Sequence, residues 1–302
     1  MSTTAQPPQI FDRRLVAARL RRALRQGPAA FLLDRAVEDF SDRLGAILRP
    51  FPRALDLATP GPQLADMLAQ KPERQVMRAA PIAETAGAGH FKNRRFETVV
   101  CDAEALPFAP ESFDLAVSAL ALQWVNDLPG TLIQIRRALA PDGLFLACMA
   151  GGQTLTELRA ALAEAEEEIV GGASPRVAPF ADIRDLGALL QRAGFALPVT
   201  DTDTVTVRYP HMFALMHDLR AMGATNALTQ RLKRPTRRAV FARAAEIYQE
   251  RFADADGRIR ATFELVWLSG WAPHESQQKP LQPGSAKMRL ADALKTQETK
   301  LE

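Results

Sequence analysis

Short apolar runs alternate with helical stretches through the first half of this chain. Runs of strand length cover residues 54–58, 75–80, 98–101, 113–118 and 144–149. Helical spacing occurs between them, as for Leu132, Ile135 and Leu139. Short apolar strands separated by helices predict a parallel sheet with helices on both faces. Such sheets bind ligands outside the carboxyl ends of their strands.

Longer elements follow in the second half. An apolar stripe between Leu155 and Ile169 predicts a long helix, for which Thr154 and Glu157 would form a capping box. Further helices are predicted over residues 185–193, 212–222 and 237–252, and strands over 202–208 and 263–271. A helical pattern also precedes the first strand. The chain is therefore expected to fold as an α/β protein with an N-terminal helical cap.

Composition narrows the classes of function. The chain has 302 residues, of which 47% are hydrophobic and 24% charged, as in ordinary soluble proteins. A net charge of +3 favours acidic partners but does not call for nucleic acid, and we expect no nucleic-acid partner. No apolar run reaches the roughly 20 residues that span a bilayer, and no signal-peptide segment is recognisable. We expect a cytoplasmic protein that can visit a membrane surface, with Cys101 and Cys148 as free buried thiols.

The turn after the first strand carries the most informative signal. Nucleotide-binding α/β domains place a glycine-rich loop there, and this chain has Asp56 at the end of the strand. Only Gly61 remains, between Pro60 and Pro62. Glycine suits such a loop because it tolerates positive φ and has no Cβ, whereas proline lacks the N–H that a ligand would meet. The sequence therefore predicts a cofactor-binding frame with an altered loop.

The order of the signals resembles the class I S-adenosylmethionine-dependent methyltransferases. The resemblance rests on Asp56, on the segment Asp102-Ala-Glu-Ala-Leu-Pro-Phe108, on the strand 113–118 and on the turn 141–143. It implies a Rossmann-like fold with a seven-stranded, mostly parallel sheet and S-adenosylmethionine as cofactor. In that family the aspartate of the third strand accepts from the adenine amino group. The implied cofactor-binding residues are Asp56, Ala58, Gly61, Glu84, Asp102, Ala103 and Leu120.

A closer resemblance covers nearly the whole chain, from about Phe11 to about Leu294. It rests on the segments 10–13, 120–129, 151–159, 175–180, 185–195, 209–213 and 270–277. These are similar to the methyltransferase-like assembly factors of respiratory complex I, which are described as hydroxylating an arginine on an iron–sulfur subunit. The resemblance implies a protein substrate or an assembly partner similar to a complex I subunit. The malonyl-carrier-protein O-methyltransferases of biotin synthesis share the N-terminal half more loosely.

The chain is expected to comprise four segments. They are a helical cap (1–48), a nucleotide-binding half (49–150), a half with an insertion for substrate or partner (151–275) and a polar, partly disordered tail (276–302).

Departures from the family pattern leave the activity open. The glycines of the family loop fall on Ala58, Pro60 and Pro62, and the acidic residue that grips the ribose falls on Pro81, with Glu84 as a substitute one turn later. Three hypotheses remain. The chain is an arginine-modifying enzyme with weakened cofactor binding, a non-catalytic assembly chaperone on the same fold, or a malonyl-carrier-protein O-methyltransferase. We assign no catalytic base.

Three further features have both a structural and a functional interpretation. Trp124 either packs in the core or lines the pocket. The arginines between residues 13 and 25 form a solvated face, or a basic helix that covers the pocket or docks an acidic partner. Two histidines and a carboxylate suit an iron site, and His211, His217, His274 and Glu275 supply those residue types. Their spacing does not bring them together, and we assign no metal.

Overall fold

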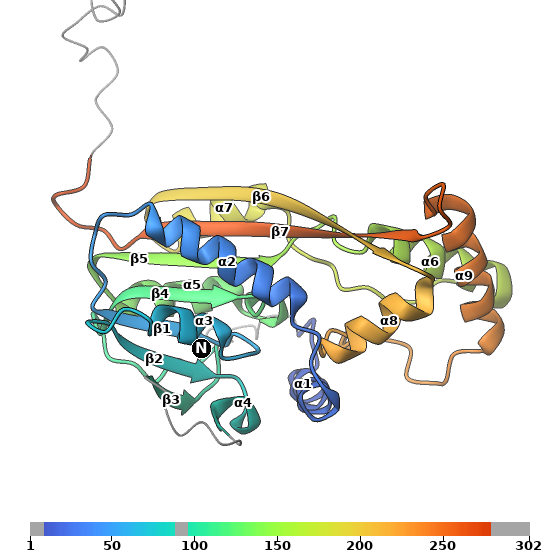
Figure 1. Ribbon diagram of the computed structural model, residues 1–302, viewed down its shortest axis with the longest axis horizontal. Helices are drawn as coiled ribbons and strands as arrows, with labels where there is room; N and C mark the ends of the chain where they lie inside the picture. Colours follow the sequence, from blue (N-terminus) through green and yellow to red (C-terminus); the bar gives the residue numbers. More distant parts are fainter. Residues whose placement is uncertain (1–8, 88–95, 279–302) are drawn as a thin grey trace, which may run out of the picture.

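The computed structural model describes residues 9–87 and 96–278, and these contain one seven-stranded sheet (Figure 1). The strand order is β3-β2-β1-β4-β5-β7-β6, with β7 antiparallel to both neighbours and the other pairs parallel. The strands are β1 (Arg53–Leu57), β2 (Gln75–Ala80), β3 (Glu97–Val100), β4 (Phe113–Ala119), β5 (Leu139–Ala150), β6 (Ala196–Tyr209) and β7 (Ile259–Trp271). The predicted mostly parallel sheet is confirmed.

Helices cover both faces of this sheet. Those of the described chain are α1 (Arg13–Gln26), α2 (Phe31–Gly45), α3 (Gln63–Leu68), α4 (Ala83–Gly87), α5 (Leu128–Ala138), α6 (Thr156–Val170), α7 (Ile183–Arg192), α8 (Met212–Ala221), α9 (Arg238–Phe252) and the short 3₁₀ helix Leu122–Trp124. One core cluster joins α2 and α3 to the sheet, and another joins α5 and α7 to it. These clusters form because each helix carries apolar residues at helical spacing and buries that face against the sheet.

A third core cluster lies at the far end of the two longest strands. Figure 1 shows β6 and β7 running beyond the other strands toward α6, α8 and α9. Tyr209 of β6 and Phe263 of β7 are buried there among residues of the three helices. Tyr248 of α9 donates from its hydroxyl to the carbonyl of Arg260 at 2.9 Å. Helices α6, α8 and α9 therefore form a layer that extends the fold past the parallel strands.

The predicted capping box is wrong. α6 begins at Thr156, and its N-cap is Leu155, whose φ is 56°. The Thr154 hydroxyl instead accepts from the N–H of Glu264 at 3.1 Å and donates to the carbonyl of the same residue at 3.2 Å. The Glu157 carboxylate accepts from the N–H of Thr262 at 3.2 Å. Both side chains therefore join the start of α6 to β7.

The assignment of Leu139 to a helix is also wrong. α5 ends at Ala138, and Leu139 starts β5 by pairing with Phe113. The predicted turn at 141–143 lies inside this strand as an irregularity, where Asp142 has a φ of 62°. The predicted polar tail lies largely outside the described residues. Within the part of the chain that the structure describes, no helix combines the length and the apolar composition needed to cross a bilayer.

Candidate functional site

A cavity of about 1040 Å³ lies where the parallel strands end. Its lining includes the residue that follows each of β1, β2 and β4, together with the last residue of β3 and of β5; these are Ala58, Pro81, Leu120, Val100 and Ala150. This is the position at which a parallel sheet binds ligands. Small-molecule sites typically have volumes of roughly 300–1000 Å³. The cavity has room for a cofactor and for part of a substrate.

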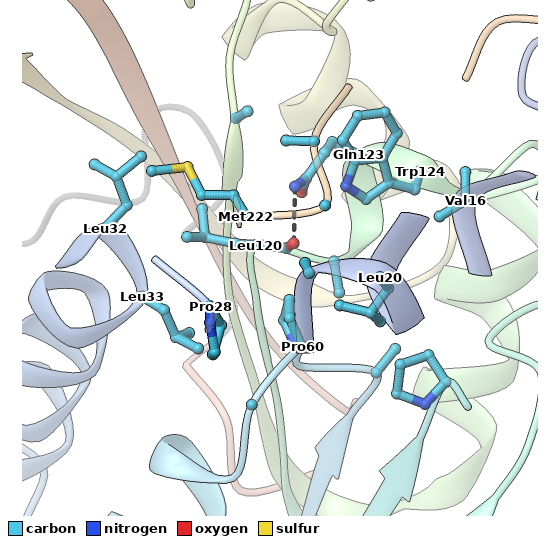
Figure 2. Close-up of a pocket in the computed structure, with 18 of the residues that line it drawn as sticks. Val16, Leu20, Pro28, Leu32, Leu33, Pro60, Leu120, Gln123, Trp124 and Met222 are labelled. Carbon is cyan, nitrogen blue, oxygen red and sulfur yellow. Dashed lines mark hydrogen bonds between the residues drawn. The ribbon is translucent and has the colours of Figure 1, made fainter. Parts of the chain in front are cut away.

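Helix α1 covers this cavity. Figure 2 shows Val16 and Leu20 of α1, Pro60 after β1 and Met222 after α8 around one space. The start of α1 is anchored because Asn126 accepts from the N–H of Phe11 at 2.8 Å and donates to its carbonyl at 3.1 Å. Of the two interpretations of the basic helix, the structure therefore supports a cover over the pocket.

The loop after β1 keeps a glycine-like backbone without glycine at its first position. Ala58 has a φ of 58° and donates its N–H to the carbonyl of Ala79 at 2.8 Å. Pro60, Gly61 and Pro62 follow it, and all four residues line the cavity. A left-handed backbone costs a non-glycine residue about 1–2 kcal/mol. The chain therefore keeps the left-handed backbone of the loop at a cost in stability. The loop also lacks the N–H donors that non-proline residues at positions 60 and 62 would supply.

Asp56 does not line the cavity, although it stands at the end of β1. It is fully buried and accepts a hydrogen bond from the Thr59 hydroxyl. Its Oδ2 lies 3.5 Å from Nε of Arg78, which pairs with it in register on the adjacent strand β2. Burial raises the pKa of Asp56 to about 6, although Arg78 and Thr59 both act to lower it. Asp56 thus supports the loop from beneath.

Arg78 is the most consequential residue that the sequence reasoning missed. It is fully buried, and its guanidinium donates to the carbonyls of Thr59 at 2.9 Å, of Gly61 at 3.0 Å and of Thr85. These bonds tie the loop after β1 to helix α4. The available signal was a charged residue within the apolar run 75–80, because buried arginines are rare unless they are paired.

Asp102 and Ala103, two of the implied cofactor-binding residues, line the cavity after β3. One carboxylate oxygen of Asp102 accepts from the N–H of Glu104 at 2.7 Å and from the guanidinium of Arg13 in α1. Burial acts to raise the pKa of Asp102, but these two donors outweigh it and hold the pKa below its ordinary value. Asp102 is therefore a charged acceptor at neutral pH.

The opposite wall comes from the end of β4. Leu120 has a φ of 50° and donates its N–H to the carbonyl of Cys148 at 2.7 Å, while its own carbonyl accepts from Gln123 at 2.8 Å (Figure 2). Trp124 lines the cavity and packs edge-on against Phe11 with 5.4 Å between ring centroids. Trp124 therefore both lines the pocket and packs against a neighbouring side chain, as its two interpretations predicted.

Glu84, an implied cofactor-binding residue, lies outside the cavity, whereas Cys101, expected to be a buried free thiol, is free but half-buried. The carboxylate of Glu84 does not line the cavity but accepts from Nε of Arg21 in α1 at 2.9 Å. Its own backbone N–H and Arg21 hold the pKa of Glu84 below its ordinary value. Cys101 does line the cavity, but burial raises the pKa of its thiol to about 11. The thiol is protonated at neutral pH and is no nucleophile there.

The candidate metal ligands lie apart. His211 caps α8 by accepting from the N–H of Ala214 at 3.1 Å, and His274 contacts the Ser276 hydroxyl at 2.7 Å. Across residues 9–87 and 96–278, no three or more histidine, cysteine, aspartate or glutamate side chains are grouped so that they could hold a metal ion. The iron interpretation therefore has no site in that part of the chain.

The ion pair between Arg13 and Asp102 is expected to slow the opening of α1. Both side chains are about two-fifths exposed (39% and 41%), and such pairs contribute about 0.5–1 kcal/mol. Arg13→Gln should therefore raise amide hydrogen exchange in α1 about two- to fivefold. Arg14→Gln is the matched control, because Arg14 also lines the cavity but forms no ion pair with any described residue. Equal exchange in both variants would show that α1 is held by its packing alone.

Comparisons with known proteins agree with this architecture. A family model for the methyltransferase domain matches residues 55–147. The YcgJ protein from Bacillus subtilis has the same fold, with a TM-score of 0.54, 15% identity and coverage of 80% of this chain and 99% of its own. The malonyl-[acyl-carrier protein] O-methyltransferase of Xylella fastidiosa is 41% identical over 172 residues, or 57% of this chain and 56% of that protein.

A longer match decides the family. The mitochondrial arginine-hydroxylase NDUFAF5 of Rattus norvegicus is 39% identical over 308 residues, covering 99% of this chain and 88% of that protein. This similarity includes the half of the chain that forms α6–α9 and the last two strands, outside the methyltransferase-domain match. The chain therefore belongs to the family of the arginine-hydroxylase NDUFAF5, built on the class I methyltransferase fold.

Proposed function

We propose that this protein binds S-adenosylmethionine in the cavity beneath α1 and modifies an arginine side chain of a protein partner. The observation that carries the proposal is the cavity itself. It occupies about 1040 Å³ at the carboxyl ends of the parallel strands, so the prolines after β1 have not closed it. The full-length similarity to an arginine hydroxylase supports arginine as the acceptor.

The cofactor would lie across the ends of β1 to β3. Asp102 would accept from the adenine amino group through its oxygen Oδ2. Its hydrogen bonds with Arg13 and with the N–H of Glu104 both end on the other oxygen, Oδ1. Ala103 would border the adenine ring, and Ala58 with Gly61 would border the amino-acid part. Leu120 would form the wall at β4. Asp56 would act through Arg78 by holding the loop, and Glu84 by anchoring α1 through Arg21.

The acceptor would be an arginine of a subunit resembling those of complex I, as the sequence resemblance implies. We place the protein in the cytoplasm, where it would meet this partner at a membrane surface. The arginines of α1 give the covered side of the cavity a positive charge that suits an acidic partner. A non-catalytic assembly chaperone on the same fold is the alternative, because Pro60 and Pro62 remove two N–H donors from the loop.

Calorimetric titration of the full chain with S-adenosylmethionine tests the proposal. We expect a dissociation constant in the micromolar range, weakened tenfold or more by Asp102→Asn, since a hydrogen bond to a charged group contributes about 1.5–3 kcal/mol. Asp114→Asn is the matched control, because Asp114 is likewise paired with an arginine, Arg53, and lies outside the cavity. Absence of heat at millimolar cofactor would reject the enzyme hypothesis for this cofactor and favour the chaperone.

A further inference from the structure

One carboxylate in the cavity has no place in cofactor binding. Glu264 belongs to β7, and its side chain lines the cavity beside the carboxyl end of β5, where Ala150 pairs with Leu265. The order β3-β2-β1-β4-β5-β7 separates β7 from β1 by three strand spacings, or about 14 Å. Apart from Leu120 at the end of β4, the cofactor residues extend from β1 toward β3, away from Glu264. Glu264 therefore lies on the side of the cavity left for the acceptor.

The loop after β5 is built around this glutamate. Gly151 donates its N–H to the carbonyl of Glu264 at 2.8 Å, and the Thr154 hydroxyl bonds both backbone groups of Glu264. Gln153 donates its N–H to carboxylate Oε2 at 3.0 Å. A Cβ at Gly151 would lie only 2.4 Å from the same oxygen. The glycine is thus required for the carboxylate to sit where it does, and four hydrogen bonds hold the residue in place.

The charges of the cavity leave Glu264 without a cation. Three arginines also line it: Arg13 and Arg21 are paired with Asp102 and Glu84, and Arg14 forms no ion pair with Glu264. Glu264 forms no ion pair with any lysine, arginine or histidine among residues 9–87 and 96–278. Its neighbours in the lining include the apolar residues Leu155 and Phe263 and the hydroxyl of Thr154. Glu264 is half-buried, and a carboxylate that is partly shielded from water attracts a cationic group more strongly than one in bulk water.

We propose that Glu264 recognises the guanidinium group of the acceptor arginine and so determines which side chain enters the cavity. The proposal rests on the proposed function, which takes arginine as the acceptor. The Gln153 N–H uses one lone pair of Oε2, so both carboxylate oxygens can still accept from the two parallel N–H groups of a guanidinium. A planar fork fits this geometry better than the point charge of an ammonium group.

Nuclear magnetic resonance titration of the full chain provides a direct test. The probes are Nα-acetyl-arginine amide and Nα-acetyl-citrulline amide, which have similar shapes but differ in charge. The amide resonance of Gln153 reports on the site because this N–H is bonded to the carboxylate. We expect the arginine probe to shift it saturably and the citrulline probe to leave it unmoved. Equal binding of the two probes would overturn the proposal.

Variants separate recognition from folding and from cofactor binding. Glu264→Gln keeps an acceptor for Gln153 and should weaken the arginine probe about tenfold or more while leaving S-adenosylmethionine affinity unchanged. Glu275→Gln, at an exposed position outside the cavity, removes the same charge and should change neither. Unchanged probe affinity in Glu264→Gln would refute the assignment. Loss of cofactor affinity would instead place Glu264 on the cofactor, which also refutes it. A chain that binds the probe but no cofactor would contradict the proposed function alone.

Discussion

Replacing Arg78 with methionine is expected to lower the free energy of unfolding by about 3–5 kcal/mol, because it leaves a buried carboxylate without its cation. Arg78 and Asp56 are both fully buried, with 3.5 Å between Nε and Oδ2. The variant also removes the donors to the carbonyls of Thr59, Gly61 and Thr85. Urea unfolding followed by circular dichroism measures the loss.

The pH dependence of the variant identifies the cause. In the folded protein the pKa of Asp56 is raised from 3.8 to about 6, and Arg78 acts to lower it. Without Arg78 the pKa rises further. A carboxyl group with a raised folded pKa binds more protons folded than unfolded, so its effect on stability worsens as pH rises from about 4 through that pKa. Arg78→Met should therefore be more destabilised at pH 8 than at pH 5.

A double-mutant cycle completes this test. Asp56→Asn in the Arg78→Met background removes the unpaired charge, and we expect it to recover about 1–3 kcal/mol. Arg74→Met is the matched control, since Arg74 is also largely buried but bonds one carbonyl, that of Phe51, at 3.1 Å. A loss no larger than that of Arg74→Met, and equal at both pH values, would contradict a buried ion pair beneath the loop.

The sheet was predictable because its signals are local. Each parallel strand is an apolar run bounded by turn residues, so five or six positions are enough to recognise it. The rule that ligands bind at carboxyl ends then brings Ala58, Asp102 and Leu120 to one place, and the structure lines one cavity with all three. Residues that closely follow a strand can be placed without knowledge of tertiary contacts.

Residues whose partners lie on other elements could not be placed in this way. Asp56 points to the side of β1 opposite to Leu55 and Leu57, toward Arg78, and only the register of β1 with β2 shows it. The pattern of Thr154 and Glu157 is that of a capping box, yet their partners are 110 and 105 residues away in β7. Local sequence predicts a local bond, and the pairing of β5 with β7 overrides it.

Restoring the loop and its acidic neighbour is expected to strengthen cofactor binding about 100-fold or more. The variant combines Ala58→Gly, Pro60→Gly and Pro62→Gly with Pro81→Asp, all at positions that line the cavity. Each proline replaced returns an N–H donor, and a hydrogen bond to a charged cofactor group contributes about 1.5–3 kcal/mol. An aspartate after β2 adds an acceptor for the ribose hydroxyls. Calorimetric titration with S-adenosylmethionine measures the gain against the unmodified chain.

Single variants show how much of this gain in cofactor affinity comes from the backbone conformation of the loop and how much from its N–H donors. Ala58→Gly should leave affinity nearly unchanged, because the backbone already has a φ of 58°, and relieving that strain gains up to about 1 kcal/mol of stability. Pro60→Gly and Pro62→Gly should carry most of the affinity but lose stability, since glycine increases the freedom of the unfolded chain. Pro110→Gly, at an exposed position outside the cavity, should lose stability without gaining affinity. A folded combined variant with unmodified affinity would mean that this loop does not meet the cofactor. The cavity beneath α1 would then serve the partner's side chain alone.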